Sequence, residues 1–230
     1  MNGDATFVSI LGNTGATTVS TVIGGNDTIN SGGQHDRVYG DTATLRMENN
    51  QGTALFQGGD DTLNGEGGND WLIGDIFRIK LNSNGGGTDT VIGGNDTING
   101  GAGDDSLIFG DFYSVVAIGA NATVIGGNDI INGGTGNDHM WGDFQNSTAS
   151  TGTVIGGSDT FVFDTGSGID TVHDFEINKD LLDVSGYGHV GIGDVTITVA
   201  GGDTTVDLGG GNSILLIGVT MLDAGDFIFA

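Results

Sequence analysis

The sequence of 230 residues contains no proline and no cysteine, and only five of its residues are lysine or arginine. Without cysteine, disulfide bonds cannot stabilise the fold. Without proline, nothing interrupts a backbone hydrogen-bond ladder, since proline is the residue that cannot donate to one. The 30 acidic residues give a formal net charge of −25, which argues against nucleic acid and anionic membranes as partners. No apolar run approaches the ~20 residues of a membrane span, so we expect none.

What the chain has in excess is glycine and aspartate. Glycine occurs 47 times, far above the ~7% of an average protein. The carboxylates are nearly all aspartate, because glutamate occurs only at Glu48, Glu66 and Glu176. A hydrophobic fraction of 36% is enough for an ordered core, but the unbalanced charges repel one another in a compact chain. We therefore expect a cationic component that the sequence does not supply.

A phrase of nine residues recurs five times. It reads VIGGNDTIN from Val22, FQGGDDTLN from Phe56, VIGGNDTIN from Val91, VIGGNDIIN from Val124 and VIGGSDTFV from Val154. Its aspartates, Asp27, Asp61, Asp96, Asp129 and Asp159, lie 34, 35, 33 and 30 residues apart. The first four copies are each followed by a second nonapeptide with its aspartate nine residues later, at Asp36, Asp70, Asp105 and Asp138, and then by a Gly-Asp pair at residues 40–41, 74–75, 110–111 and 142–143. Such a period predicts a solenoid.

These units resemble the repeats-in-toxin (RTX) family, whose nonapeptide is G-G-x-G-x-D-x-U-x, where U is a large apolar residue. Nine nonapeptide-like units share the aspartate at position six and the apolar residue at position eight, and the resemblance covers residues 22–175. It implies that six residues of each unit form a turn, that three form a short strand, and that two units close one 18-residue coil of a calcium-binding parallel β-roll.

The residue types are consistent with that structure on physical grounds. Glycine permits the positive φ angles of tight turns, and the apolar eighth residues, such as Ile29 and Leu63, can point into a narrow core. Neighbouring coils lie about 4.8 Å apart, so equivalent aspartates repel unless a cation separates them. Ca²⁺ takes six to eight oxygens at ~2.3–2.6 Å, a reach that spans two coils. The candidate ligands are Asp27, Asp36, Asp61, Gly65, Gly68, Asp70, Asp96, Gly101, Gly103, Asp105, Asp129, Gly134, Gly136, Asp138, Asp159 and Asp170.

The quality of these candidate sites should differ along the chain. We expect the best-formed ones in the unbroken turns 65–70, 100–105 and 133–138. The turn at residues 31–36 should be the poorest, because Gln34 replaces a turn glycine.

Variable segments separate the nonapeptide pairs and depart from the family pattern. They cover residues 42–55, 76–90, 112–123 and 144–153. Residues 42–47 and 53–56 read as strands on either side of a turn, as do residues 76–81 and 88–92. We therefore expect hairpin-like arms inserted on one side of the roll. The alternative is that each period of about 34 residues forms one wide coil.

From residue 160 the composition changes, and the sequence is similar to the closing region of serralysin-type proteases and other calcium-dependent type I secreted proteins. Residues 194–200, 204–208 and 213–219 read as strands of a cap that protects the open end of the solenoid. The last residues, Asp226 to Ala230, resemble the acidic-then-apolar secretion signal of that class, whereas the start of the chain lacks the pattern of a signal peptide. We divide the chain into a partial preceding repeat with the pair Gly3-Asp4 (1–21), the roll (22–160), and a capping and secretion-signal region (161–230).

The sequence contains no convincing catalytic pattern. The loop at Asp164 resembles an aspartic-protease loop, but that chemistry needs two facing carboxylates, and the segment falls where a repeat turn belongs. The four histidines, His35, His139, His173 and His189, fit no metalloprotease spacing and are expected at the rim. The aromatic residues Tyr39, Trp71, Phe109 and Trp141 form either a sugar-stacking stripe or, as we expect, core and rim filling. The threonines from Thr17 onward suggest an ice-binding face, against which the unequal segment lengths argue.

The sequence therefore predicts an all-β protein, a calcium-bound parallel β-roll with inserted arms and a C-terminal β cap. Its expected function is non-catalytic: a folding and stabilising module, with several Ca²⁺ ions, of a protein handled by type I secretion machinery and located outside the cell or on its surface. An enzyme active site would have to lie in a domain upstream of Met1. The alternative is an adhesin or glycan-binding module whose arms recognise a surface ligand with Arg46, Arg78, Lys80 and Tyr113.

Overall fold

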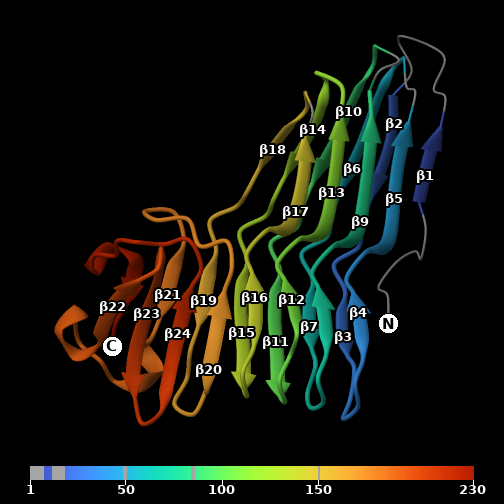
Figure 1. The fold of residues 1–230 in the computed structure, drawn as a ribbon. Helices are drawn as coiled ribbons and strands as arrows, with labels where there is room; N and C mark the ends of the chain where they lie inside the picture. The colour runs from blue at the N-terminus through green and yellow to red at the C-terminus, as the bar shows by residue number, and fades with distance from the viewer. Residues whose placement is uncertain (1–7, 12–18, 49–50, 84–85, 150) are drawn as a thin grey trace.

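The computed structural model describes residues 8–11, 19–48, 51–83, 86–149 and 151–230, which form a parallel β-solenoid (Figure 1). Two sheets of the upper part have the strand orders β1-β5-β9-β13-β17 and β18-β14-β10-β6-β2. Two sheets of the lower part have the orders β25-β21-β19-β15-β11-β7-β3 and β22-β23-β24-β20-β16-β12-β8-β4. The predicted parallel roll is confirmed.

The strands of the upper sheets are β1 (Val8–Leu11), β5 (Thr42–Glu48), β9 (Ile76–Asn82), β13 (Phe112–Ile118) and β17 (Phe144–Ala149), facing β2 (Val19–Ile23), β6 (Thr53–Gln57), β10 (Thr88–Ile92), β14 (Ala122–Ile125) and β18 (Thr153–Ile155). The lower sheets contain β3 (Thr28–Asn30), β7 (Thr62–Asn64), β11 (Thr97–Ala102), β15 (Ile130–Thr135), β19 (Thr160–Val162), β21 (Leu181–Asp183) and β25 (Phe227–Ile228), facing β4 (Arg37–Tyr39), β8 (Trp71–Ile73), β12 (Leu107–Phe109), β16 (His139–Trp141), β20 (Ile169–Val172), β22 (Thr196–Ala200), β23 (Asp203–Gly209) and β24 (Asn212–Leu216). Three 3-10 turns, η1 (Ser185–Tyr187), η2 (Ile192–Asp194) and η3 (Ala224–Asp226), lie between cap strands.

The expected hairpin-like arms are wrong, and the wide coil is what forms. β5 and β6 are strands where predicted, but they do not pair with each other: β5 pairs in parallel with β9, and β6 with β10. The register joins residues one period apart, such as Thr42 with Ile76. Because every coil has nearly the same length, the neighbouring coil offers each strand a continuous partner, and the apolar faces of β5 and β6 are buried against each other instead.

Each coil therefore passes through two rolls, and the coils of both rolls stack in the same direction (Figure 1). The lower roll, built from the nonapeptide strands, buries residues such as Leu72, Ile108 and Phe161. The upper roll has a separate core that includes Leu45 and Phe112. We call the junction between them the waist; it comprises the Gly-Asp pairs 40–41, 74–75, 110–111 and 142–143 and the segments 24–27, 58–61, 93–96, 126–129 and 156–159. We call the opposite end of the lower roll, at residues 31–36, 65–70, 100–105, 133–138 and 164–170, the turn edge.

An aromatic cluster lies where strands of the lower roll continue into the upper roll. Phe109 is fully buried there and Trp141 is 6% exposed. The ring of Trp141 stacks on that of Phe109, with centroids 4.5 Å apart. The expected role in core and rim filling is confirmed for these two residues.

The C-terminal region covers one end of the lower roll. β22, β23 and β24 form an antiparallel meander, and β24 joins the roll by pairing in parallel with β20. β25, in the last residues of the chain, pairs with β21. At the other end, the ladders extend to β1 and β2. The pair Gly3-Asp4 and the threonine stretch at 17–18 lie outside the described residues. No helix in the described ranges has the length and apolar character that a membrane crossing requires.

Candidate metal sites

The turn edge stacks one aspartate of each coil above the next. The backbone amide of Asp70 donates to Asp105 Oδ1 at 2.7 Å, and the amide of Asp105 donates to Asp138 Oδ1 at 2.8 Å. Asp36 and Asp170 extend this row at its two ends, through bonds of 2.7 and 3.1 Å to their neighbours. The row follows the axis of the solenoid at the strand spacing, as the sequence predicted.

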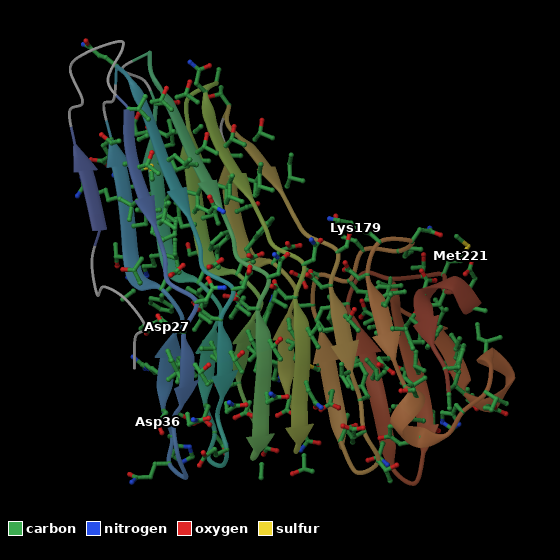
Figure 2. The ribbon with its side chains drawn as sticks, turned by 180° about the vertical axis from the view of Figure 1, so that it is seen from behind. Asp27, Asp36, Lys179 and Met221 are labelled. Carbon is green, nitrogen blue, oxygen red and sulfur yellow. The ribbon has the colours of Figure 1, made fainter. Side chains whose placement is uncertain are left out.

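The waist contains two rows of aspartates rather than one. In the first, the amide of Asp61 donates to Asp96 Oδ1 at 2.6 Å, and the amide of Asp96 donates to Asp129 Oδ1 at 2.7 Å. The second row consists of the aspartates of the Gly-Asp pairs, Asp41, Asp75, Asp111 and Asp143, all at most 4% exposed. Figure 2 shows Asp27 at the waist and Asp36 at the turn edge, at opposite ends of the lower roll.

Each row leaves carboxylate oxygens buried without a hydrogen bond. At the turn edge this applies to the Oδ2 atoms of Asp70, Asp105 and Asp138, for which the described residues offer no partner. At the waist the same holds, within the described ranges, for Oδ2 of Asp96, Asp129 and Asp159 and for Oδ1 of Asp75. An unpaired buried carboxylate oxygen is costly, and a bound cation is one of the few ways to compensate it.

At the turn edge and at the waist, the surroundings of the aspartates oppose their ionisation in the absence of a cation. Burial, reinforced by neighbouring carboxylates, raises the pKa of Asp138 to about 8 and that of Asp159 to about 9. Burial also raises the pKa of Asp75 and Asp111 well above the ordinary range, and the facing aspartates add to the effect. A divalent cation reverses this balance because it stabilises the ionised form.

The glycines confirm that the space beside these aspartates is lined with oxygen. A Cβ on Gly133 would lie 2.5 Å from Asp138 Oδ2, and one on Gly65 would lie 2.7 Å from Asp70 Oδ2. A Cβ on Gly100 would collide with both Asp105 Oδ2 and the carbonyl oxygen of Gly133. Among the described residues, no three His, Asp or Glu side chains converge on one point, so carbonyl oxygens have to complete any ligand set. Hard oxygen ligands of both kinds are what Ca²⁺ prefers, and the residues present fit that ion.

Five of the six predicted glycine ligands have the positive φ angles expected of turn glycines, whereas Gly65 does not. Gly68, Gly103 and Gly136 have φ angles of 139°, 142° and 140°, and Gly101 and Gly134 have 103° and 95°. The turn at 31–36 departs from this pattern: Gln34 stands where the others have a left-handed glycine, and Asp36 is half-buried while Asp70, Asp105 and Asp138 are buried.

The structure brings in residues that our sequence-based ligand set lacks. The waist opposite the predicted row is lined by Asp41, Asp75, Asp111 and Asp143. Beyond the last of these, Asp174 Oδ1 accepts the amide of Gly142 at 2.8 Å. The signal was present in the sequence, since a Gly-Asp pair recurs once in every period. Its meaning depends on contacts such as that of Asp75 with Gly94, 19 positions later, which the repeat alone does not reveal.

The protease-like loop and the histidines make contacts that belong to the fold. The segment 164–170 occupies the turn of the next coil, because Gly136 and Gly168 are bridged in parallel. His139 and His173 lie on neighbouring coils with Nδ1 and Nε2 2.9 Å apart, and His173 stacks on Trp141 with centroids at 4.0 Å. His35 is exposed and bonds to the backbone of Asn69.

Comparison with known proteins identifies the repeats. The RTX calcium-binding nonapeptide repeat matches in four copies, at residues 24–42, 57–77, 83–115 and 126–149. Among solved structures, the extracellular lipase LipA from Serratia marcescens is 21% identical, with a TM-score of 0.39 over 97% of this chain. The matched part is 42% of the lipase chain, so this chain spans less than half the length of that protein. No curated protein matches the sequence.

Proposed function

Because the repeats of this chain are RTX calcium-binding nonapeptide repeats, we propose that the chain is a calcium-dependent folding module of a secreted protein. Calcium binding to the aspartate rows supplies the free energy that folds the solenoid. The ligands are assembled only in the folded coils, so binding and folding form one equilibrium. In the proposal the module itself is non-catalytic.

The buried unpaired carboxylate oxygens are the observation that carries this proposal. Asp70, Asp105 and Asp138 each have one such oxygen at the turn edge, and the equivalent set lies at the waist. Carboxylates in these positions oppose folding when they are ionised and unpaired. Calcium, when bound, supplies the positive charge and coordination that make the same oxygens stabilising. Stability then depends on the external calcium concentration, to which extracellular modules with Kd of ~10⁻⁴–10⁻³ M are matched.

Export through type I secretion machinery is the second part of the proposal. At low calcium, as in the cytosol, the acidic chain would stay unfolded and able to thread through a channel. The C-terminal residues support this order of events. Phe227 is 7% exposed and β25 is paired with β21 in the folded state, so a signal located there is accessible only before folding.

Small-angle scattering tests the folding proposal. A compact chain of this length has a radius of gyration of ~17 Å and an unfolded one ~52 Å. In excess chelator we expect a value near the second, and in millimolar calcium a value near the first, with equal magnesium as the control. An expanded chain in saturating calcium, or a compact one in chelator, would refute the proposal.

A surface-binding function is the second candidate, and one groove favours it. The outer face of β5, β9 and β13 carries a groove of about 310 Å³ lined by Arg46, Arg78 and Lys80, three of the five basic residues of the chain. Glu48 pairs with Arg46 at 2.5 Å and with Lys80 at 2.6 Å, which holds these side chains along the face. The concentration of positive charge on a strongly acidic molecule suits an anionic glycan.

A binding measurement separates this candidate from the first. Calcium-loaded protein would be titrated with carboxylated and sulfated oligosaccharides, alongside Arg78→Gln and, as a control that removes one charge from the lower roll, Arg37→Gln. The surface-binding candidate predicts binding that Arg78→Gln weakens and Arg37→Gln leaves unchanged. It is wrong if no anionic oligosaccharide binds, or if both variants have the same effect.

A further inference from the structure

The waist has the geometry of a six-residue RTX turn that has been cut open. At the turn edge, a Cβ on Gly100 would meet Oδ2 of Asp105, five residues later, and the carbonyl of the equivalent glycine in the next coil, Gly133. At the waist, a Cβ on Gly74 would meet Oδ2 of Asp96, 22 residues later, and the carbonyl of its own equivalent, Gly110. The same oxygens converge on the same position in both places.

The glycine at the fourth position of the turn is matched in the same way. A Cβ on Gly103, at the turn edge, would collide with the carbonyl of Gly68 in the preceding coil. A Cβ on Gly94, at the waist, would collide with the carbonyl of Gly59. Residues 74–75 and 93–96 are thus the two halves of one turn, and the strands β9 and β10 of the upper roll are inserted between them.

An aspartate closes the cut in each coil. Asp75 accepts the amide of Gly94 through Oδ2 at 3.0 Å, and Gly127 donates to Asp111 Oδ1 at 2.8 Å. At the turn edge the second position of the turn is left-handed, with φ of 65° at Glu66, 103° at Gly101 and 95° at Gly134, a conformation that favours glycine. At the waist the chain leaves the second position into an extended strand, so a carboxylate can replace that glycine.

The substitution doubles the buried negative charge at each level. A coil contributes one buried carboxylate to the turn edge, such as Asp105, and two to the waist, such as Asp75 and Asp96. One Ca²⁺ per coil would leave an excess positive charge at the turn edge and would be balanced at the waist. Calcium affinity rises with the charge of the ligand set and the rigidity of the site.

We propose that the reassembled turns of the waist form a second class of calcium site, tighter than the sites of the turn edge, in which the aspartates of the Gly-Asp pairs are ligands. This inference rests on the proposed calcium-dependent function. Since each waist turn is complete only when the upper roll has brought its two halves together, these sites link the folding of the upper roll to that of the lower roll.

Calcium titration of matched variants tests the inference. Calcium uptake would be measured by calorimetry and by competition with a chromophoric chelator for the wild type, for Asp75→Asn with Asp111→Asn at the waist, and for Asp70→Asn with Asp105→Asn at the turn edge. Both double variants remove two buried charges. We expect two classes of sites in the wild type, a tight class weakened at least tenfold by the waist variant, and a weaker class reduced by the turn-edge variant.

The possible failures are distinguishable. A wild type that binds no calcium would overturn the proposed function together with this inference. Calcium-dependent folding with one class of sites, affected equally by the two variants, would overturn the inference alone. If the waist variant does not fold, crystals of the calcium-loaded wild type decide the question by anomalous scattering: ions beside Gly74 and Gly110 support the proposal, and ions confined to the turn edge contradict it.

Discussion

At the residue scale, an aspartate such as Asp105 uses the two oxygens of its carboxylate for different contacts. In Asp105, Oδ1 accepts a backbone amide of the neighbouring coil, while Oδ2 is buried without a hydrogen bond to any described residue. The first oxygen fixes the side chain, and the second faces the space beside the turn glycines. In the folded coil, the rotamer that a cation site needs is thereby set by the backbone of the neighbouring coil.

The raised pKa values predict how the metal-free protein responds to pH. Asp138 and Asp159 have folded-state pKa values of about 8 and about 9, because burial disfavours their charged forms. Since the unfolded values are lower, ~3.9, the unfolded state loses protons first as pH rises, and stability falls. In chelator, β structure should therefore increase as the pH is lowered from 9 to 5.5, as measured by circular dichroism.

Saturating calcium should remove or reverse that dependence, because protons then compete with calcium for the same oxygens. Metal-free protein that gains structure on going from pH 5.5 to pH 9 would show that the buried rows do not control folding.

Substitutions at two glycines can distinguish the cost of backbone strain from the cost of filling the oxygen-lined space. Gly103 has φ of 142°, and its Cβ would collide with the carbonyl of Gly68, whereas Gly166 has φ of 93° and open space around it. Gly166→Ala should cost about 1–2 kcal/mol from the left-handed conformation alone. Gly103→Ala should cost clearly more and should weaken calcium binding, as measured by urea unfolding and calcium titration. Equal effects of the two substitutions on calcium affinity would count against the assigned site.

Much of the site could be predicted from the sequence, because ligands within one continuous turn have a fixed spacing along the chain. The aspartates at position six and the turn glycines such as Gly103 follow directly from the nonapeptide. Asp75 and Asp111 could not be assigned in this way, since they act across a gap of about 20 residues that closes only in the folded coil. Gln34 is the reverse case: a single visible substitution in the nonapeptide predicts a poorer calcium site at residues 31–36, and this stays a prediction.

At the element scale, the coil is the repeating unit, and its strands form their backbone hydrogen bonds with the neighbouring coils. The strand positions in the variable segments were predictable from alternation, but their pairing was not. Alternation in β5 and β6 shows which side chains are buried and is equally compatible with a hairpin and with two facing sheets. The near-constant period was the deciding feature, because equal coil lengths let every strand find its equivalent one coil away.

The lower core provides a test of coil stacking. Leu72 is fully buried between strands of the lower roll, and Leu72→Ala should reduce the free energy of unfolding in saturating calcium by about 2–5 kcal/mol. Ile130→Ala, on an exposed face of β15, should change it by less than about 0.5 kcal/mol. Denaturant unfolding measures both, and similar small losses would mean that the lower roll is not a packed unit.

At the scale of the whole molecule, the proposed function would make the acidic composition that opposes folding the means of regulating it. A charge of −25 disfavours any compact state, and about eight Ca²⁺ ions, one for each gap along two edges, would bring it to about −9. The coils are stacked along one axis, so each ion, if bound as proposed, would join neighbouring coils, and the stabilisation would propagate along the solenoid.

The most direct test of calcium-controlled folding is the far-UV circular dichroism of the full chain, recorded in excess chelator and again as calcium is added to millimolar concentration. The account predicts a disordered spectrum in chelator at neutral pH, converted cooperatively into a β spectrum by calcium and not by magnesium. A β spectrum that is already present in chelator and unchanged by calcium would contradict it.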